Sequence, residues 1–437
     1  MRMYDIIDKK RLGEKLTKEE IAFFIKGYTE GSIPDYQASA LLMAIAINGM
    51  DAEETAELTL LMAESGEMLD LSVINGVHVD KHSSGGVGDK TTLIIGPMVA
   101  ALGIPVAKMS GRGLGHTGGT IDKLESIPGF NTSLSKETFF NNVNTLGLAV
   151  AGQTANLAPA DKKLYALRDV TATVSSIPLI AASIMSKKLA AGADVIVLDV
   201  KTGSGAFMKT EEGAAELARR MVEIGEKAGR KTFAVITDMN DPLGTAVGNA
   251  LEVIEAIDAL KGKGDSKLME VVYTLASYMV FGAGKASSPE EARKLLEGTI
   301  ESGKALETFA KFVKAQGGDE RFVYDTSLFK LGSLEEDLLS DSDGFVTNIL
   351  ADEVGIASLI LGGGREKKED VIDPGVGIIV HKKTSDHVAK GEPIATLYAN
   401  DAAKLIEAKK RLRGAFTIGK DKVKEYVMIK NIYHLLY

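Results

Sequence analysis

The sequence contains no cysteine among its 437 residues. This absence excludes disulfide bonds, a thiolate nucleophile and a cysteine-ligated metal, and it fits a reducing cytosol. Positive charge is not in excess either: the net charge is −9, whereas nucleic-acid binding needs clustered lysine and arginine. The longest apolar run, residues 93–107, is interrupted by two glycines and two prolines and cannot span a bilayer. The first residues lack the apolar segment of a signal peptide. We therefore expect a soluble, cytoplasmic protein that binds neither nucleic acid nor membrane.

The first 65 residues have helical patterns with no strand between them. Thr17 and Glu20 form a capping box before a stretch whose apolar residues recur on one helical face. Residues 36–47 and 52–64 predict two more helices. The apolar faces are wide for so few helices, so we expect further helices or a partner subunit to pack against this α lobe.

From residue 77 onward, strand-like runs alternate with helical ones, which is typical of an α/β sheet. The strand-like runs are residues 77–80, 105–109, 195–200 and 234–236. A helical block at 161–191 interrupts the alternation, and we assign it to the α lobe. The chain would then cross between lobes more than once and leave a hinged cleft, a preferred place for small ligands. Beyond residue 341, short β runs with turns predict a third module.

The segment 79–92 combines two lysines, serine and threonine hydroxyls and three glycines ahead of a predicted helix at 91–102. Glycines let backbone N–H groups approach a ligand, and a helix N-terminus adds further donors. With the charge of Lys81 and the hydroxyls of Ser83 and Thr92, the segment predicts a phosphate site. A plain glycine-rich turn is the alternative. A P-loop is excluded because Asp89, and not glycine, precedes Lys90.

A second glycine-rich segment, 110–120, contains the spacing G-x-G-x-x-G after a strand. It does not predict a dinucleotide site, because glycines continue where a helix should begin and the acidic residue Glu137 lies in a helix start. We interpret it as a second wall of the anion site, with Ser110 and Thr120 as donors. Arg112 and His116 could be catalytic or could brace the loop.

Arg168, Ser183 and Lys187 lie on two predicted helices, the last two on one face because they are four residues apart. Two cations and a hydroxyl suit a planar ligand with carbonyl oxygens and a ring N–H, such as a pyrimidine. A solvated charged face remains the alternative.

Three long motifs, residues 80–89, 110–126 and 198–208, resemble the thymidine/pyrimidine-nucleoside phosphorylase family, and the similarity runs along nearly the whole chain. The resemblance implies a small helical lobe, a larger α/β lobe with a mixed sheet, a hinged cleft between them and a C-terminal β-rich, barrel-sandwich-like module. It divides the chain into 1–66 with 163–193, 67–162 with 194–335, and 336–437. It also implies a homodimer formed largely through the α lobes.

The same resemblance implies the reaction: reversible phosphorolysis of uridine, thymidine and deoxyuridine to free base and α-(deoxy)ribose-1-phosphate, without an organic cofactor. A thymidine-restricted enzyme and a phosphoribosyltransferase of similar architecture are the alternatives. The family's site residues map onto phosphate binders (Lys81, Ser83, Thr92, Ser110, Thr120), base binders (Arg168, Ser183, Lys187) and His82 between base and sugar. His82, Arg168 and Lys187 would act in catalysis.

Two further features follow from the resemblance. Lys108 stands where thymidine-restricted members often have methionine, so we expect its ammonium to bind a ribose 2′-OH. A structural K⁺ site is implied at Gly88, Lys90, Leu243, Ala246 and Glu255. Close relatives often have threonine at position 90, and an ammonium there would weaken or replace the ion.

Overall fold

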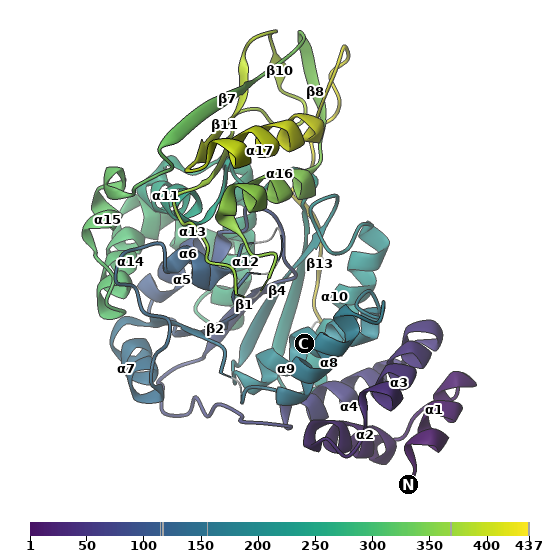
Figure 1. Ribbon diagram of the computed structural model, residues 1–437. Coiled ribbons are helices and arrows are strands. Elements are labelled where there is room, and N and C mark those ends of the chain that lie inside the picture. The colour runs from purple at the N-terminus through teal and green to yellow at the C-terminus, as the bar shows by residue number, and fades with distance from the viewer. Residues whose placement is uncertain (114, 116–117, 155, 368, 436–437) are drawn as a thin grey trace.

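The computed structural model describes residues 1–437 except 114, 116–117, 155, 368 and 436–437. Figure 1 shows the N-terminal helices at one end, a central sheet with flanking helices, and the C-terminal β-rich module at the opposite end. No helix among the described residues is both long and apolar enough to cross a membrane.

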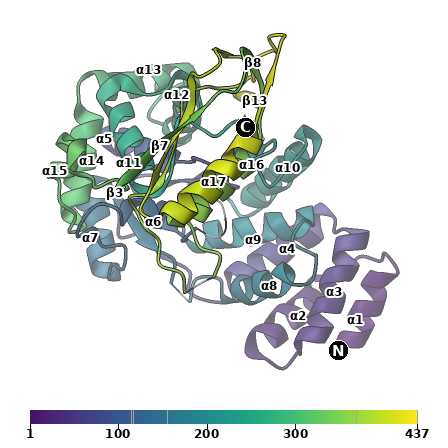
Figure 2. The ribbon, with the colours of Figure 1, turned by 45° about the horizontal axis from the view of Figure 1, so that its top comes forward.

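The helical lobe contains the helices expected from the sequence and one more at the N-terminus. Its members are α1 (Met3–Arg11), α2 (Lys18–Glu30), α3 (Asp35–Asn48), α4 (Ala52–Ala63), α8 (Pro159–Asp169) and α9 (Ile177–Ala190). The last two pack against the N-terminal helices, with Leu164 and Leu179 buried in the same core as Phe24 and Leu41 (Figure 2). Of the two expectations for this lobe, further helices or a partner subunit, the packing of further helices is observed.

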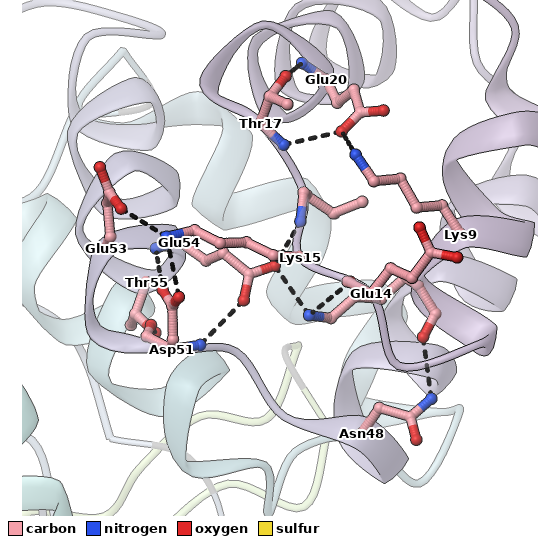
Figure 3. A network of polar contacts seen from close by, with 12 residues as sticks. Lys9, Glu14, Lys15, Thr17, Glu20, Asn48, Asp51, Glu53, Glu54 and Thr55 are labelled. Atoms are coloured by element: carbon pink, nitrogen blue, oxygen red, sulfur yellow. Dashed lines mark hydrogen bonds and ion pairs between the residues drawn. The ribbon is translucent and has the colours of Figure 1, made fainter.

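Local polar contacts explain where these helices begin. Thr17 and Glu20 form the predicted capping box, and Asp51 with Glu54 forms a second one that starts α4. Glu54 also accepts hydrogen bonds from Leu16 N and from Lys10 Nζ, each at 2.8 Å, and Lys10 and Glu54 are both 3% exposed. Figure 3 shows Glu54 between the chain segments of Asp51 and Lys15. This buried pair fixes α1 against α4.

The central sheet has the strand order β13-β5-β4-β1-β2-β3. Its strands are β1 (Val79–Ser83), β2 (Val106–Ser110), β3 (Leu148–Gly152), β4 (Val195–Thr202), β5 (Lys231–Asp238) and β13 (Ile429–Tyr433). Five strands are parallel and β13 is antiparallel to β5, so the sheet is mixed as expected. Strand β4 is central and all eight of its residues are buried, as the apolar run predicted.

Helices cover both faces of the sheet, and side-chain alternation along β4 decides which core each residue joins. Val195 and Val197 face one core, whereas Ile196 and Leu198 face the other. The covering helices are α5 (Thr91–Ala101), α6 (Thr120–Leu124), α7 (Lys136–Leu146), α10 (Glu211–Lys227), α11 (Asn249–Asp258), α12 (Ser266–Gly282), α13 (Pro289–Glu301), α14 (Lys304–Ala315) and α15 (Arg321–Tyr324).

In the described part of the C-terminal module, the chain forms two small sheets and two α-helices. Its elements are β7 (Leu334–Leu339), β8 (Gly344–Ile349), α16 (Ala351–Ser358), β9 (Gly377–Val380), β10 (His387–Val388), β11 (Pro393–Ala399), α17 (Ala402–Ala415) and β12 (Phe416–Gly419). The short β6 (Ala246–Val247), which precedes α11, pairs with β9 and joins this module to the α/β lobe.

The division of the chain into three domains remains a prediction, except for the C-terminal boundary, which the structure corrects. Residues 429–433 form β13 and pair with β5 of the central sheet, so the segment 336–437 is not confined to the C-terminal module. Short polar strands of this kind carry no sequence signal for a partner so far away in the chain.

Candidate active site

The site lies at the carboxyl ends of β1, β2, β3 and β4. From β1 the chain continues to β2 on one side, and from β4 it continues to β5 on the other side. The connecting helices α5 and α10 pack in the cores on opposite faces of the sheet. The β1–β4 boundary is therefore the topological switch point, where α/β sheets bind ligands in a crevice outside the strand ends. The residues Asp80, Lys81, His82 and Ser83 lie on this boundary.

A buried ion cluster occupies the β1 side of that boundary. Asp80 is fully buried and accepts hydrogen bonds from Lys108 Nζ at 3.1 Å and from Lys188 Nζ at 2.8 Å. Burial would raise the pKa of Asp80, but the charges of the two lysines outweigh it, and the pKa lies below its ordinary value. A buried carboxylate is kept ionised only by such partners.

A second cluster lies beside it around Lys81. Lys81 Nζ donates to Thr91 Oγ1 at 2.6 Å and lies 3.5 Å from Asp199 Oδ2 and 3.6 Å from Asp89 Oδ2. Lys201 Nζ is 2.8 Å from Asp199 Oδ2. Burial would raise the pKa of Asp89, but the charge of Lys81 and that of neighbouring lysines hold it well below the usual range.

The two clusters together place four lysines against three aspartates, so positive charge predominates at the ends of these strands. In a setting of low dielectric constant, a residual positive charge attracts an anion far more strongly than it would in water. This arrangement is suited to phosphate.

His82 is half-buried on β1, and the charges of four lysines act on it. Burial lowers its pKa well below the ordinary value of 6.5, and the positive charges of Lys188, Lys108, Lys187 and Lys81 lower it further. The imidazole is therefore neutral at pH 7. A neutral imidazole offers one N–H donor and one acceptor nitrogen to a ligand.

The predicted phosphate residues lie in β1 (Lys81, Ser83), at the end of β2 (Ser110) and in α5 and α6 (Thr92, Thr120). Ser83 Oγ accepts a hydrogen bond from Gly85 N at 3.2 Å, and Gly85 has a φ of +98°. Gly86 packs so closely that an added Cβ would lie 2.7 Å from Lys201 Cδ. Thr92 and Thr120 stand in the first turns of α5 and α6 and line one small pocket.

A large cleft lies between the ends of β2 and β3 and the helices α8 and α9. Its volume is about 880 Å³, and its walls include Ser110, Gln153, Asp161, Tyr165 and Lys187. A cavity of this size accommodates a nucleoside-sized ligand. The α lobe and the α/β lobe both contribute to it, as expected from a chain that crosses between them.

Ser183, Lys187 and Arg168 have different surroundings. Lys187 Nζ donates to Asp161 Oδ2 at 2.5 Å and to Ser183 Oγ at 3.0 Å, so Lys187 and Ser183 are in contact. Arg168 is 2% exposed and donates to the carbonyl oxygens of Thr173, Val174 and Leu179. These bonds use three of its five N–H groups, and burial lowers its pKa.

Lys108 is buried on β2, two residues before Ser110, which lines the cleft. In addition to its bond to Asp80, its Nζ donates to Lys81 O at 2.6 Å, which leaves one donor. Burial lowers its pKa to about 8, despite the opposing charge of Asp80. The predicted contact with a ribose hydroxyl would use that third donor.

Arg112 braces the second glycine-rich loop. Its guanidinium donates to Asp122 and to both carboxylate oxygens of Glu125. The bracing interpretation therefore accounts for its contacts, although its side chain also borders the cleft. His116 lies outside the described residues.

The residues of the implied K⁺ site come together, but the geometry does not fit an added ion. Lys90 Nζ itself donates to Leu243 O, Ala246 O and Glu255 Oε2. Among the residues that the structure describes, no group of three or more His, Asp or Glu side chains is arranged to hold a metal ion.

Several charged residues of the site were not singled out by the sequence pattern: Asp161, Lys188, Asp199, Lys201 and Lys123. Lys123 Nζ donates to Asp89 O at 2.6 Å and pairs with Glu252 at 2.7 Å. The available signal was charge within apolar strands, because Asp199 and Lys201 interrupt an otherwise apolar β4. A charge at such a position must find a buried partner.

Comparisons with known proteins agree with this architecture. Three family models match: "Glycosyl transferase family, helical bundle domain" at 4–66, "Glycosyl transferase family, a/b domain" at 75–306, and "Pyrimidine nucleoside phosphorylase C-terminal domain" at 345–419. Among solved structures, anthranilate phosphoribosyltransferase from Thermus thermophilus matches with a TM-score of 0.59 at 22% identity. That match covers 71% of this chain and 99% of the other, and it shows a shared fold.

Curated relatives match over almost the full length. The chain is 62% identical to a pyrimidine-nucleoside phosphorylase of Bacillus subtilis (strain 168) over 400 residues, which are 92% of each chain. It is 60% identical, with the same coverage, to a pyrimidine-nucleoside phosphorylase of Geobacillus stearothermophilus. With matching models for all three domains and identity of this level, the chain belongs to the pyrimidine-nucleoside phosphorylase family.

Proposed function

We propose that this protein catalyses the reversible phosphorolysis of pyrimidine nucleosides, giving the free base and α-(deoxy)ribose-1-phosphate. The observation that carries the proposal is the surplus of buried lysines around His82 at the sheet's switch point, beside a cleft of about 880 Å³. The relatives from Bacillus subtilis and Geobacillus stearothermophilus are pyrimidine-nucleoside phosphorylases, which supports the same chemistry.

In the proposed reaction, a phosphate oxygen forms a bond to C1′ while the bond from C1′ to N1 of the base breaks. The bonding electron pair leaves with the base. The protein must hold the phosphate in line with C1′ and stabilise the negative charge that develops on the pyrimidine. Phosphate is the co-substrate, and no organic cofactor takes part.

We assign phosphate binding to Lys81, Ser83, Thr92, Ser110 and Thr120. The support is threefold: Lys81 and Ser83 lie on β1 in the lysine-rich region, Ser110 lines the cleft at the end of β2, and Thr92 and Thr120 lie in the first turns of α5 and α6, where a helix N-terminus favours an anion. The phosphate dianion would balance the surplus positive charge, which is a strong interaction in a buried setting.

We assign recognition of the base to Arg168, Ser183 and Lys187. Lys187 supports this most directly, since it lines the cleft and keeps one N–H donor beyond its bonds to Asp161 and Ser183. Arg168 retains two N–H groups beyond its three carbonyl bonds. His82 would donate its N–H to O2 of the base as a neutral hydrogen-bond donor, because its lowered pKa disfavours an imidazolium.

Sugar specificity is assigned to Lys108, whose third donor would bind the 2′-OH of uridine. Removing such a donor leaves the hydroxyl without a partner, which costs binding. A thymidine-restricted enzyme remains the second candidate, and the structure favours the broader one only through the presence of this buried ammonium.

A phosphoribosyltransferase is disfavoured by the partners of the nearby acids. It would need carboxylates to hold Mg²⁺ near the glycine-rich loop, and Asp80 and Asp89 are the candidates. Asp80 is paired with two lysines, and the pKa of Asp89 is held down by lysines as well. These carboxylates are already neutralised.

We also propose a homodimer formed through the α lobe. Large apolar side chains are exposed on α1 and α3: Tyr4 is 68% exposed, and Tyr36 and Ile47 are each 74% exposed. Tyr36, Met43 and Ile47 share one face of α3 by their spacing. Large apolar side chains exposed together on one helix face are typical of association sites. A cytoplasmic location is proposed from the absence of cysteine.

The experiment is an ultraviolet assay in which uridine and thymidine are incubated separately with the protein, with and without inorganic phosphate. Phosphate-dependent release of base from both nucleosides is the expected result. Release from thymidine alone would identify the restricted enzyme, and release without phosphate would identify a hydrolase. Absence of release from either nucleoside would refute the proposed function.

A further inference from the structure

Two carbonyl oxygens from the segment between β5 and α11 and a carboxylate from α11 meet at one point, and the Lys90 ammonium occupies it; these three oxygens are called the cradle. Lys90 Nζ lies 2.8 Å from Leu243 O, 2.9 Å from Ala246 O and 2.6 Å from Glu255 Oε2. The Lys90 residue is 0% exposed. An ammonium carries three N–H donors, so each donor has an acceptor.

The Glu255 carboxylate forms an ion pair with the Lys90 ammonium. Its carboxylate also accepts from Thr245 N at 2.7 Å, Thr245 Oγ1 at 3.1 Å and Ala246 N at 2.8 Å. Burial would raise the pKa of Glu255, but the charge of Lys90 and these hydrogen bonds outweigh it, so the pKa lies below its ordinary value. One positive and one negative charge thus balance inside the cradle.

Gly88 closes the cradle from the glycine-rich loop. A Cβ added at Gly88 would lie 2.6 Å from Leu243 O and 3.2 Å from Ala246 O, and the residue has a φ of +76°. Leu243 N also donates to Val87 O at 3.0 Å. The backbone therefore packs directly against the oxygens that hold the ammonium.

A free monovalent cation bound here would use the same oxygens. It would then lie against the Lys90 ammonium, and like charges in a buried setting repel strongly. We infer that Lys90 Nζ is a built-in substitute for a structural monovalent cation, so this protein assembles its loops without K⁺.

The Lys90 ammonium holds together the glycine-rich loop, the segment between β5 and α11, and α11 itself. Lys383 from the C-terminal module donates to two other carbonyl oxygens of the same loop, Pro242 O at 2.7 Å and Gly244 O. The loop continues into β6, which pairs with β9 of that module. Lys90 thus links the glycine-rich loop to the segment on which the C-terminal module is mounted.

The test compares thermal unfolding in KCl and in choline chloride at equal ionic strength. The unaltered protein is expected to have the same Tm in both salts. Lys90→Thr shortens the side chain and leaves room for an ion, so its Tm in choline should fall, on the order of 5 °C, and recover saturably as K⁺ is added. Lys90→Met, which fills the cradle with an apolar chain, should lose stability equally in both salts.

Three results would overturn the inference. One is a saturable rise of Tm with K⁺ in the unaltered protein, and another is about one K⁺ per chain by elemental analysis after dialysis into choline chloride. A Lys90→Thr chain that folds but does not respond to K⁺ would also overturn it. If that variant fails to fold, the two measurements on the unaltered protein decide alone. None of these readouts depends on turnover, so they stand apart from the proposed reaction.

Discussion

Replacing Lys187 by methionine tests whether its ammonium acts on the substrate or only supports the wall of the cleft. The side chain is 20% exposed and its partner Asp161 is 6% exposed. Removing the ammonium leaves a buried carboxylate without its ion pair, which costs about 1–3 kcal/mol of stability. A contact that stabilises developing charge in the transition state is worth about 10²–10³-fold in kcat.

The double variant Lys187→Met with Asp161→Asn separates these two effects. It removes both charges together, so no uncompensated carboxylate remains and most of the lost stability should return. If Lys187 stabilises the departing pyrimidine, the double variant should still be about 10²-fold slower than the unaltered protein.

The assay follows base release from uridine at saturating phosphate, with Tm measured on the same preparations. We expect Tm to recover in the double variant while kcat does not. Recovery of both, or a single variant that loses Tm but keeps its rate, would show that Lys187 is only structural.

Three other substitutions test separate parts of the structure. The pKa of His82 in the folded protein lies below its ordinary value of 6.5, so as pH falls the unfolded chain binds this proton first and stability is lost below about pH 6.5. His82→Gln removes this group, so the fall of Tm between pH 7 and 5 should become shallower. An unchanged Tm profile would contradict a neutral imidazole. Lys108→Met should lower the ratio of kcat/KM for uridine to kcat/KM for thymidine by about 10–100-fold. In the unaltered protein, the same ratio should decline above about pH 8, because Lys108 then loses its proton. An unchanged ratio in the variant would refute the assignment of Lys108 to the 2′-OH. Lys10→Met should lower the free energy of unfolding by about 3–5 kcal/mol, because Glu54 is left buried without its ion pair. The double variant Lys10→Met with Glu54→Gln should lose less, and urea unfolding measures both losses. Equal losses in the two variants would show that the ion pair does not fix α1.

Features that depend on neighbouring residues were predictable from the sequence alone. The capping box of Thr17 and Glu20, the buried central strand at 195–200 and the helical block at 161–191 follow from spacing over a few residues. The glycine-rich segments predict an anion site from the same kind of local pattern, and this site remains a proposal.

Only the tertiary structure decided how the charges pair. Lys90 meets its acceptors 153, 156 and 165 positions later in the chain, and Asp80 meets Lys188 after 108 positions. No local pattern encodes such contacts, because they arise when parallel strands place distant residues at one edge of a sheet. Burial then makes each unpaired charge so costly that every lysine and aspartate there must find a partner. The sequence by itself supplied the charged groups, and the fold determined that one of them, Lys90, stands where a free cation was expected.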